Sequence, residues 1–239
     1  MKQALIAFVI ISLLTVIAPA SDTIETSEGD LVITCIGHAS LMMEFKGMVI
    51  HIDPFSRAGD YAKMPKGDLV LSTHHHGDHL DLGAIEAVKK EGTIIVLTEL
   101  GSKKLAGGLI MKNGDVKTVK GLKIEAVPAY NIKHQRSAGK PYHPKGEGNG
   151  YVVTFGDKRV YIAGDTENTP EMKTLTAIDV AFLPVNTPYT MDGEMARAAA
   201  LSFKPKIVYP YHFQFGQSQL EQFQALMKGV EGIEIRVRK

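Results

Sequence analysis

The sequence predicts an α/β protein in which two mixed β-sheets pack face to face under outer helices. Each half of the chain carries a hairpin signal, Lys46-Gly47 in the first and Gly156-Asp157 in the second, between apolar runs of strand length. The segments that follow alternate strand-like and helix-like apolar spacing. We therefore expect the ends of the strands to meet at one rim and to carry the functional site there.

Apolar spacing assigns the individual elements in order along the chain. In the first half we predict helices at about 81–90 and 99–106, and strands at 31–35, 41–45, 48–52, 68–72 and 93–97. A strand pair at 116–119 and 123–128 then leads into a long loop at 129–149. In the second half we predict helices at 170–175, 194–203 and 220–227, and strands at 150–155, 159–163, 180–183, 207–209 and 233–237.

The first twenty residues are predicted to be a signal peptide that is not part of the fold. Lys2 supplies a positive n-region, residues 4–17 are apolar except for two hydroxyl side chains, and Ala18-Pro19-Ala20 fits a cleavage site. A transmembrane anchor is the alternative, but this run is about 14 residues long and a span needs roughly 20. We therefore expect cleavage, export to the periplasm or the medium, and no stable membrane anchor afterwards.

The mature chain, residues 21–239, has the length of a single domain. It would carry 26 basic and 26 acidic side chains, and this balance argues against nucleic-acid binding. Its lone cysteine, Cys35, falls in a strand pattern and is expected to be a buried thiol.

Four side chains suited to metal binding follow a predicted strand in the heptapeptide Thr-His-His-His-Gly-Asp-His. His74 and His76 alternate, so an extended backbone points both to the same side. Gly77 permits a bend that aims Asp78 and His79 at a second point nearby. Imidazole and carboxylate ligands suit Zn, with Mn and Fe as alternatives. A chance histidine-rich loop is the competing interpretation, but four of the nine histidines fall within six residues.

Two other predicted strands also end on side chains that bind metals. Asp165 follows a strand and Gly164, where its carboxylate could bridge two ions; alternatively it caps a helix at 168–175. His212 follows the strand at 207–209. Strand ends gather at one rim, so both side chains are candidates for the same centre.

The order His-x-His-x-Asp-His, Gly-Asp-Thr and a late strand-end His resembles the metallo-β-lactamase superfamily over about residues 31–238. Ile36-Gly37-His38-Ala39-Ser40 and Ile52-Asp53-Pro54 are similar to the branch that holds L-ascorbate-6-phosphate lactonase and N-acyl phosphatidylethanolamine phospholipase D. The resemblance implies the metallo-β-lactamase fold, an αββα sandwich of two mixed β-sheets with outer helices. It also implies hydrolysis of a small-molecule substrate at a dinuclear metal centre.

By matching position, the resemblance implies a first metal bound by His74 and His76, a second bound by further ligands, and one bridging ligand. The ligands of the second metal would be Asp78, His79 and His212, and the bridge would be Asp165. The family's extra histidine for the first metal is not found at the matching strand end, which carries Asn131 in this chain. Asn131, His134 and His143 are the candidates to complete this site, and we favour His143.

The expected chemistry follows from two divalent transition metals held close together. They would lower the pKa of a bridging water, to give hydroxide near neutral pH, and polarise the scissile carbonyl or phosphoryl group. Asp78 and Asp165 are therefore expected to be catalytic as well as metal-binding. Asp53 would orient a ligand histidine. His38 would either give a proton to the leaving group or have a structural role.

The loop at 129–149 bears on the class of substrate. The loop at 129–149 carries four basic side chains against one acidic side chain, namely Lys133, Arg136, Lys140, Lys145 and Glu147. If this loop borders the site it favours an anionic substrate; otherwise it is an ordinary solvated loop. Tyr189 could face the same cleft. A phosphodiester, a lactone or another ester fits, and a β-lactam is disfavoured because a bridging carboxylate is typical of the superfamily's other hydrolases.

Two other classes of protein compete with a hydrolase. A di-iron redox protein on this fold would normally carry an attached flavin domain, for which the mature chain has no room. A non-catalytic metal-binding or scaffold protein remains the main alternative. The intact set of Asp78, His79, Asp165 and His212 argues against it, because a scaffold has no need to keep every ligand.

Overall fold

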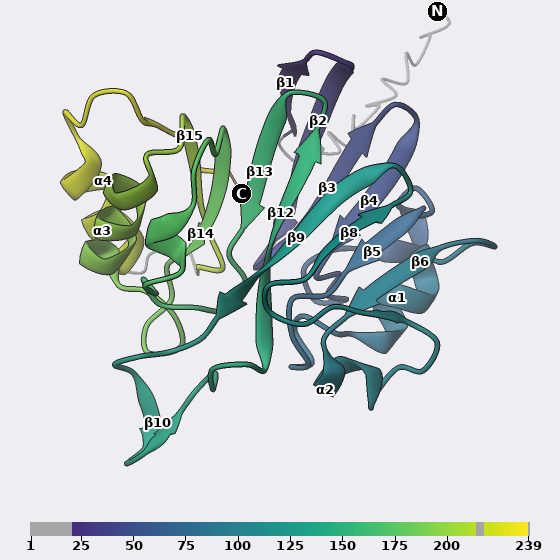
Figure 1. Cartoon of the computed structure of the whole chain (residues 1–239), viewed down its shortest axis with the longest axis horizontal. Helices are drawn as coiled ribbons and strands as arrows, with labels where there is room; N and C mark the ends of the chain where they lie inside the picture. The colour runs from purple at the N-terminus through teal and green to yellow at the C-terminus, as the bar shows by residue number, and fades with distance from the viewer. Residues whose placement is uncertain (1–20, 214–217, 239) are drawn as a thin grey trace, which may run out of the picture.

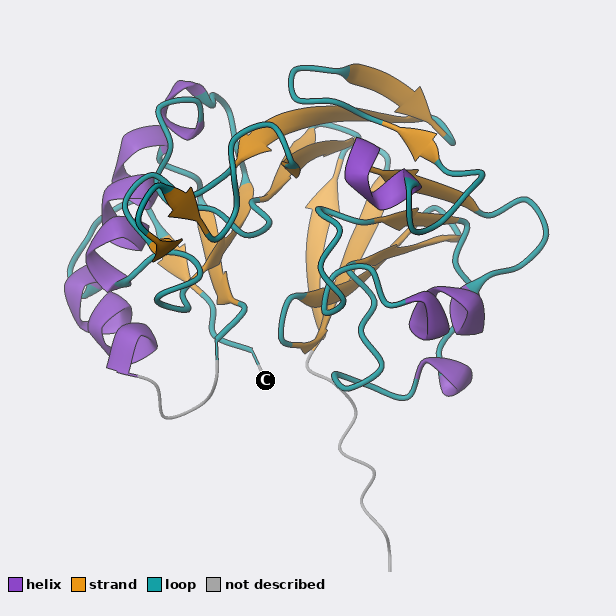
Figure 2. Cartoon of the chain, turned by 90° about the horizontal axis from the view of Figure 1, so that it is seen from below, coloured by secondary structure: helices purple, strands orange, loops and turns teal. Residues whose placement is uncertain are grey.

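The computed structural model describes residues 21–213 and 218–238 of the chain. The predicted signal peptide therefore lies outside the described residues. Two seven-stranded sheets face each other, with helices α1 and α2 on one outer side and α3 and α4 on the other (Figures 1 and 2). This arrangement confirms the predicted αββα sandwich of two mixed sheets.

The first sheet is formed by the first seven strands in chain order. Antiparallel pairing joins the first four strands, and parallel pairing joins the rest. The strands are β1 (Ser21–Thr26), β2 (Gly29–Gly37), β3 (Ser40–Phe45), β4 (Met48–Ile52), β5 (Leu69–Leu71), β6 (Ile94–Leu97) and β7 (Leu109–Ile110).

The second sheet has the strand order β16-β15-β14-β13-β12-β9-β8, and it is likewise part parallel and part antiparallel. Its strands are β8 (Val116–Val119), β9 (Leu122–Ala129), β12 (Gly148–Phe155), β13 (Lys158–Ile162), β14 (Val180–Pro184), β15 (Ile207–Tyr211) and β16 (Glu234–Ile235). A separate small hairpin, β10 (Gln135–Ser137) and β11 (Lys140–Pro141), projects away from this sheet (Figure 1).

Apolar side chains fill three layers. Between the sheets, alternate residues of β2 point inward, and the rings of Phe45 and Phe155 meet edge to face at 5.3 Å. Helix α1 (Leu82–Val88) packs on the outer face of the first sheet, and α2 (Glu99–Ser102) lies beside β6. Helices α3 (Gly193–Phe203) and α4 (Ser218–Met227) pack on the second. None of the helices in the described ranges combines the length and the hydropathy needed to cross a bilayer.

The predicted buried thiol is confirmed, because Cys35 lies in the core between the sheets. Burial raises the pKa of its thiol to about 12. A thiol that stays protonated is a weak nucleophile and a weak ligand, so Cys35 fills space in this fold.

Several predicted elements differ from the structure at their ends. The helix predicted at 99–106 stops after Ser102. The helix predicted at 170–175 is a single 3₁₀ turn, Met172–Thr174. The predicted loop at 129–149 contains the β10–β11 hairpin, and the polar strand β1 was not predicted. Contacts with distant parts of the chain determine where these short elements form and end, and local apolar spacing does not predict such contacts.

Candidate metal centre

The histidine motif forms a tight turn directly after β5. The backbone N–H groups of His79 and Leu80 both donate to the carbonyl of His76, at 3.1 and 2.8 Å. Asp81 then caps α1 by accepting from the N–H groups of Gly83 and Ala84. The motif is therefore fixed between a buried strand and a capped helix, as its sequence predicts.

The first group of donor atoms comes from His74, His76 and His143, whose ligand nitrogens lie within 4.8 Å of one another. His74 Nε2 is 3.1 Å from His76 Nδ1. His143 Nε2 is 3.3 Å from Asp165 Oδ2. The loop that carries His143 thus folds back over the site, and the structure brings His143 together with the two histidines of the motif.

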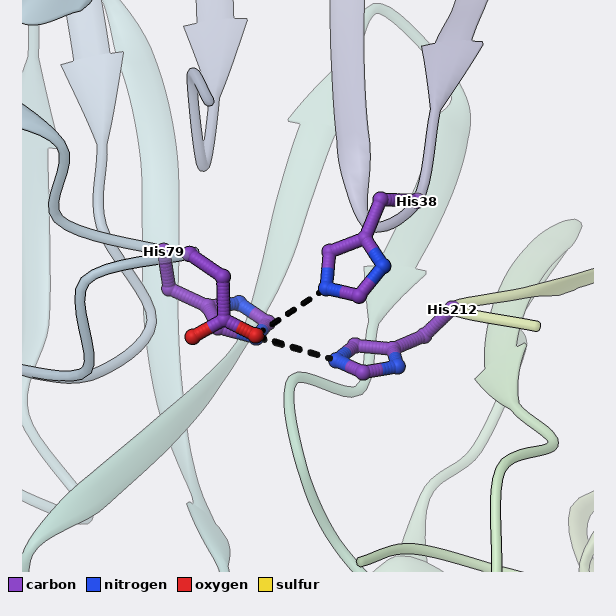
Figure 3. A group of neighbouring side chains, drawn as sticks. His38, His79 and His212 are labelled. Atoms are coloured by element: carbon purple, nitrogen blue, oxygen red, sulfur yellow. Dashed lines mark hydrogen bonds and ion pairs between the residues drawn. The ribbon is translucent and has the colours of Figure 1, made fainter. Parts of the chain in front are cut away.

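The second group comes from His38, Asp78, His79 and His212. The rings of His38, His79 and His212 converge from three separate segments (Figure 3). His79 Nε2 and His212 Nε2 are 3.1 Å apart, and Asp78 Oδ2 lies 3.7 Å from the first and 3.9 Å from the second. Asp78 Oδ2 also contacts His38 Nε2 at 3.0 Å.

Asp165 lies between the two groups. Its Oδ1 is 3.4 Å from His79 Nε2 and 3.2 Å from His212 Nε2, while its Oδ2 faces His143. Oδ1 is buried and has no hydrogen-bond partner among the described residues. The alternative role as a helix cap is wrong, because the 3₁₀ turn begins only at Met172. A buried carboxylate oxygen that faces nitrogen acceptors is stable only with a cation or proton between them, so the residues present fit a metal pair.

Neighbouring side chains set the direction of the ligand histidines. Asp53 Oδ2 is 2.7 Å from His79 Nδ1, and both carboxylate oxygens of Asp53 accept hydrogen bonds from Thr73. Thr73 Oγ1 also lies 3.1 Å from His74 Nδ1. With the Nδ1 atoms of His74 and His79 bonded in this way, their Nε2 atoms face the centre. Asp53 therefore occupies the orienting position predicted for it.

Backbone and side-chain contacts also fix the histidines of the second group. His38 and His212 both adopt a positive φ, 52° and 55°, and the N–H of His212 donates to the carbonyl of His38 at 2.8 Å. The side-chain amide of Asn186 is 3.0 Å from His212 Nδ1. Two strained backbone positions locked to each other place both rings at the rim.

Burial keeps most of these imidazoles neutral. It lowers the pKa of His143 to about 3 and, together with neighbouring His75, that of His76 to about 4. Burial also raises the pKa of Asp165 to about 6. Burial alone would lower the pKa of His79, but the carboxylates of Asp165 and Asp53 raise it to about 9. Neutral imidazoles have lone pairs available to bind a metal. The negative carboxylates favour a cation between the imidazole and carboxylate groups.

A cavity of about 320 Å³ opens beside the metal-ligand candidates. Beyond those ligands its lining includes Arg136, Tyr142 and Tyr189. The guanidinium of Arg136 lies 5.7 Å from the centre of the Tyr142 ring, which packs edge to face against Tyr189 at 5.0 Å. The predicted loop thus borders the site through Arg136, whereas Lys145 pairs with Glu171 at 2.6 Å.

The other two candidates for the first site lie outside it. Asn131 turns its amide oxygen to His143, and His134 Nδ1 is 2.9 Å from Glu167 Oε1. Sequence reasoning missed Glu167 and Asn186 as supporting residues. Asn186 follows the end of β14 and carries the strand-end signal that identified His212, whereas nothing in the local sequence marks Glu167.

Comparison with known proteins agrees with this geometry. The model of the beta-lactamase superfamily domain matches residues 32–212. The chain is 35% identical over 193 residues to the UPF0173 metal-dependent hydrolase of Methanopyrus kandleri, covering 76% of this chain and 83% of that protein. It is 32% identical over 214 residues to the Thermus thermophilus UPF0173 metal-dependent hydrolase, covering 82% of this chain and 92% of that one.

Solved structures give the same result. A candidate metal-dependent hydrolase from Parabacteroides distasonis superposes with a TM-score of 0.87 at 48% identity, covering 92% of this chain and 99% of that chain. A metallo hydrolase from Ignicoccus hospitalis superposes with a TM-score of 0.70 at 28% identity, covering 87% and 94%. With its buried His and Asp clusters on this fold, the chain belongs to the β-lactamase superfamily and, within it, to the UPF0173 metal-dependent hydrolases.

Proposed function

We propose that this protein is an exported dinuclear hydrolase with zinc as its metal. The observation that supports this most strongly is Asp165, whose two oxygens face two separate groups of nitrogen donors. One metal would be held by His74, His76 and His143, the other by Asp78, His79 and His212, with Asp165 shared between them. Sites rich in imidazole with a few carboxylates suit Zn better than harder cations, which favour oxygen ligands.

The two ions, when bound, would lower the pKa of a water and polarise the bond to be cleaved. The protein supplies orientation and proton delivery. Asp78 is held by His38, whose side chain is 24% exposed and also lines the cavity. A histidine that touches both a ligand carboxylate and the substrate space is suited to give a proton to the leaving group.

The cavity supports a small anionic substrate. Its volume of about 320 Å³ fits a metabolite-sized molecule, and Arg136 is a cation beside the ligand cluster. The guanidinium rests on the Tyr142 ring and forms no ion pair with any carboxylate of the described residues, so it can bind an incoming anion. We propose an ester, lactone or phosphodiester bond, in keeping with the branch of lactonases and phospholipases D that the sequence resembles.

A substrate panel tests this function. Protein reconstituted with Zn, Mn or Fe is offered chromogenic phosphodiester, lactone, thioester and lactam substrates. We expect turnover of at least one anionic ester, lactone or diester. Asp165→Ala should lose this activity, whereas Asp30→Asn, which changes an exposed carboxylate, should retain it. Equal rates in wild type and Asp165→Ala, or a lactam as the preferred substrate, would contradict the proposal.

Export has a separate test. If the signal peptide is removed after Ala20, the protein from its native host has the mass of residues 21–239 and lies outside the cytoplasm. An intact Met1 terminus in the cytosolic fraction would refute this part of the proposal and leave the hydrolase activity unaffected.

A further inference from the structure

His143 reaches the first donor group from a loop, and a buried network holds it there. The family's extra histidine normally sits at the strand end, where this chain has Asn131. Both Asn131 and His143 are buried, at 5% and 6% exposure. Their backbones also pair, because the N–H of Asn131 donates to the carbonyl of His143 at 2.9 Å. The residue at the strand end is thus in direct contact with the loop histidine that reaches the first donor group.

The side chain of Asn131 uses its full hydrogen-bonding capacity in this network. Its Oδ1 accepts from the backbone N–H of His143 at 2.8 Å and lies 2.8 Å from His143 Nδ1. Its Nδ2 donates to the carbonyl of Tyr189 at 2.8 Å and to Glu167 Oε1 at 3.2 Å. A backbone N–H can only donate and a backbone carbonyl can only accept. These two partners therefore fix which end of the amide is the oxygen.

This orientation determines the tautomer of His143. An amide oxygen cannot donate, so the proton between it and the ring must belong to His143 Nδ1. His143 Nε2 then carries a lone pair, and that atom faces Asp165 Oδ2 at 3.3 Å. The amide therefore prepares Nε2 as a ligand even though it does not face the donor group itself.

Glu167 fixes the turn that carries Asn131. Its buried carboxylate accepts three successive backbone N–H groups, from Ile132 at 2.9 Å and from Lys133 and His134 at 2.7 Å each. Burial would raise the pKa of Glu167, but these three donors lower it and keep the carboxylate ionised. A charged group that ties down a turn at three points leaves the adjacent Asn131 little freedom.

We propose that Asn131, held by Glu167, is a positioning residue that sets the tautomer and direction of His143 at the first metal site. Through the carbonyl of Tyr189 the same amide also anchors the wall of the substrate cavity. The inference rests on the proposed function, because it assigns His143 to a metal. Asn131 would thus act on the metal site through His143 and not as a ligand itself.

Stepwise metal affinity tests this inference without an activity assay. Metal-free wild type, Asn131→Leu, His143→Ala and the double variant are titrated with Zn²⁺ against a chromophoric chelator. Asn131→Leu keeps the size of the side chain and removes its four hydrogen bonds. We expect Asn131→Leu to weaken one of the two binding steps, the same step that His143→Ala weakens, and to leave the other step unchanged. The loss in affinity should be about 10- to 100-fold, the usual effect of removing a hydrogen-bond partner of a ligand histidine. The double variant should lose nothing beyond His143→Ala.

Asn168→Ala is the matched control, because Asn168 lies beside Glu167 on the segment after β13 and makes no hydrogen bond to His143. This variant should bind Zn²⁺ as the wild type does. If Asn131→Leu fails to fold, Asn131→Ser replaces it, because a hydroxyl cannot reach both His143 and Tyr189. Unchanged affinities, an equal loss in both steps, or a further loss in the double variant would overturn the inference. A wild type that binds no Zn²⁺ would instead refute the proposed function.

Discussion

Asp165 contacts both groups of nitrogen donors through its two carboxylate oxygens. Removing it would take a ligand from each of the two proposed metals at once, whereas removing His38 would take away the proposed proton donor and its contact with Asp78. We expect Asp165→Ala to abolish hydrolysis, and His38→Ala to slow it by about 100- to 10,000-fold, the usual contribution of a general acid. Rates on a working substrate, measured with the metal content of each variant, check this. A larger loss in His38→Ala than in Asp165→Ala would show that the roles are reversed.

For single residues, the sequence predicts the candidate metal ligands better than it predicts the side chains that orient them. The histidine turn is local, so spacing and one glycine suffice to predict its shape. Asp165 and His212 follow from the rule that strand ends meet at one rim. Asn131 is predicted as a candidate ligand because its place at the end of a strand is also a local feature. Its contact with Glu167 spans 36 residues and depends on a folded turn that no local pattern records.

Gly164 gives strand β13 the ending that the site requires. It adopts a φ of +67°, and a Cβ there would lie 2.9 Å from the carbonyl oxygen of Asn149 and 3.1 Å from Thr73 Cβ. We expect Gly164→Ala to lower the free energy of unfolding by about 2 kcal/mol or more, from left-handed strain and the overlap. Gly121→Ala, with a φ of +84° and open space around it, should lose about 1–2 kcal/mol from strain alone. Urea unfolding of both variants checks this, and equal losses would contradict the close packing at Gly164.

The β10–β11 hairpin brings Arg136 to the cavity. We expect Arg136→Ala to raise KM for an anionic substrate by about 10- to 100-fold, the loss of one hydrogen bond to a charged group, with a smaller change in kcat. Lys140→Ala, an exposed change on the same hairpin, should leave both constants near wild type. Steady-state kinetics against an anionic substrate and a neutral analogue check this. An equal effect on both substrates would mean that Arg136 acts on structure and not on charge.

Among the elements, the long apolar strands and α3 were predictable, because each buries a regular face. Asp192 directly precedes α3 and caps it by accepting from the N–H of Met195. Strand β1 was not predictable, because its sequence is polar and it forms a strand only through its antiparallel pairing with β2. The β10–β11 hairpin was missed for the same reason, because its side chains are mostly exposed.

Across the whole molecule, the first strand is tied to the last segment. Asp22 accepts from Tyr209 OH at 2.6 Å and from Arg238 at 2.7 Å. Burial would raise the pKa of Asp22, but these donors outweigh it and lower the pKa. A lowered folded-state pKa stabilises the protein above the unfolded value of about 4, and that stability is lost as the pH falls through the folded-state pKa.

We therefore expect Asp22→Asn to lower the free energy of unfolding at pH 7 by roughly 1–2 kcal/mol, the value of hydrogen bonds to a charged group. The difference from wild type should shrink as the pH falls below about 4, where the native carboxyl also becomes neutral. Chemical unfolding across this pH range checks it, with Asp30→Asn as an exposed control on β2. If the difference in unfolding free energy between wild type and Asp22→Asn stays constant with pH, the ionised carboxylate of Asp22 is not the source of this stability.

We expect this chain to hold a pair of transition-metal ions between its two groups of ligands. Elemental analysis of the purified mature protein, before and after reconstitution with Zn, Mn or Fe, tests it most directly. We predict about two ions per chain in the wild type, mainly Zn, because five histidines, Asp78 and the shared Asp165 provide the ligands of two sites. We expect a marked loss of metal in Asp165→Ala, because this change removes a ligand from both sites at once. A wild type that holds no Zn, Mn or Fe even after reconstitution would contradict the account.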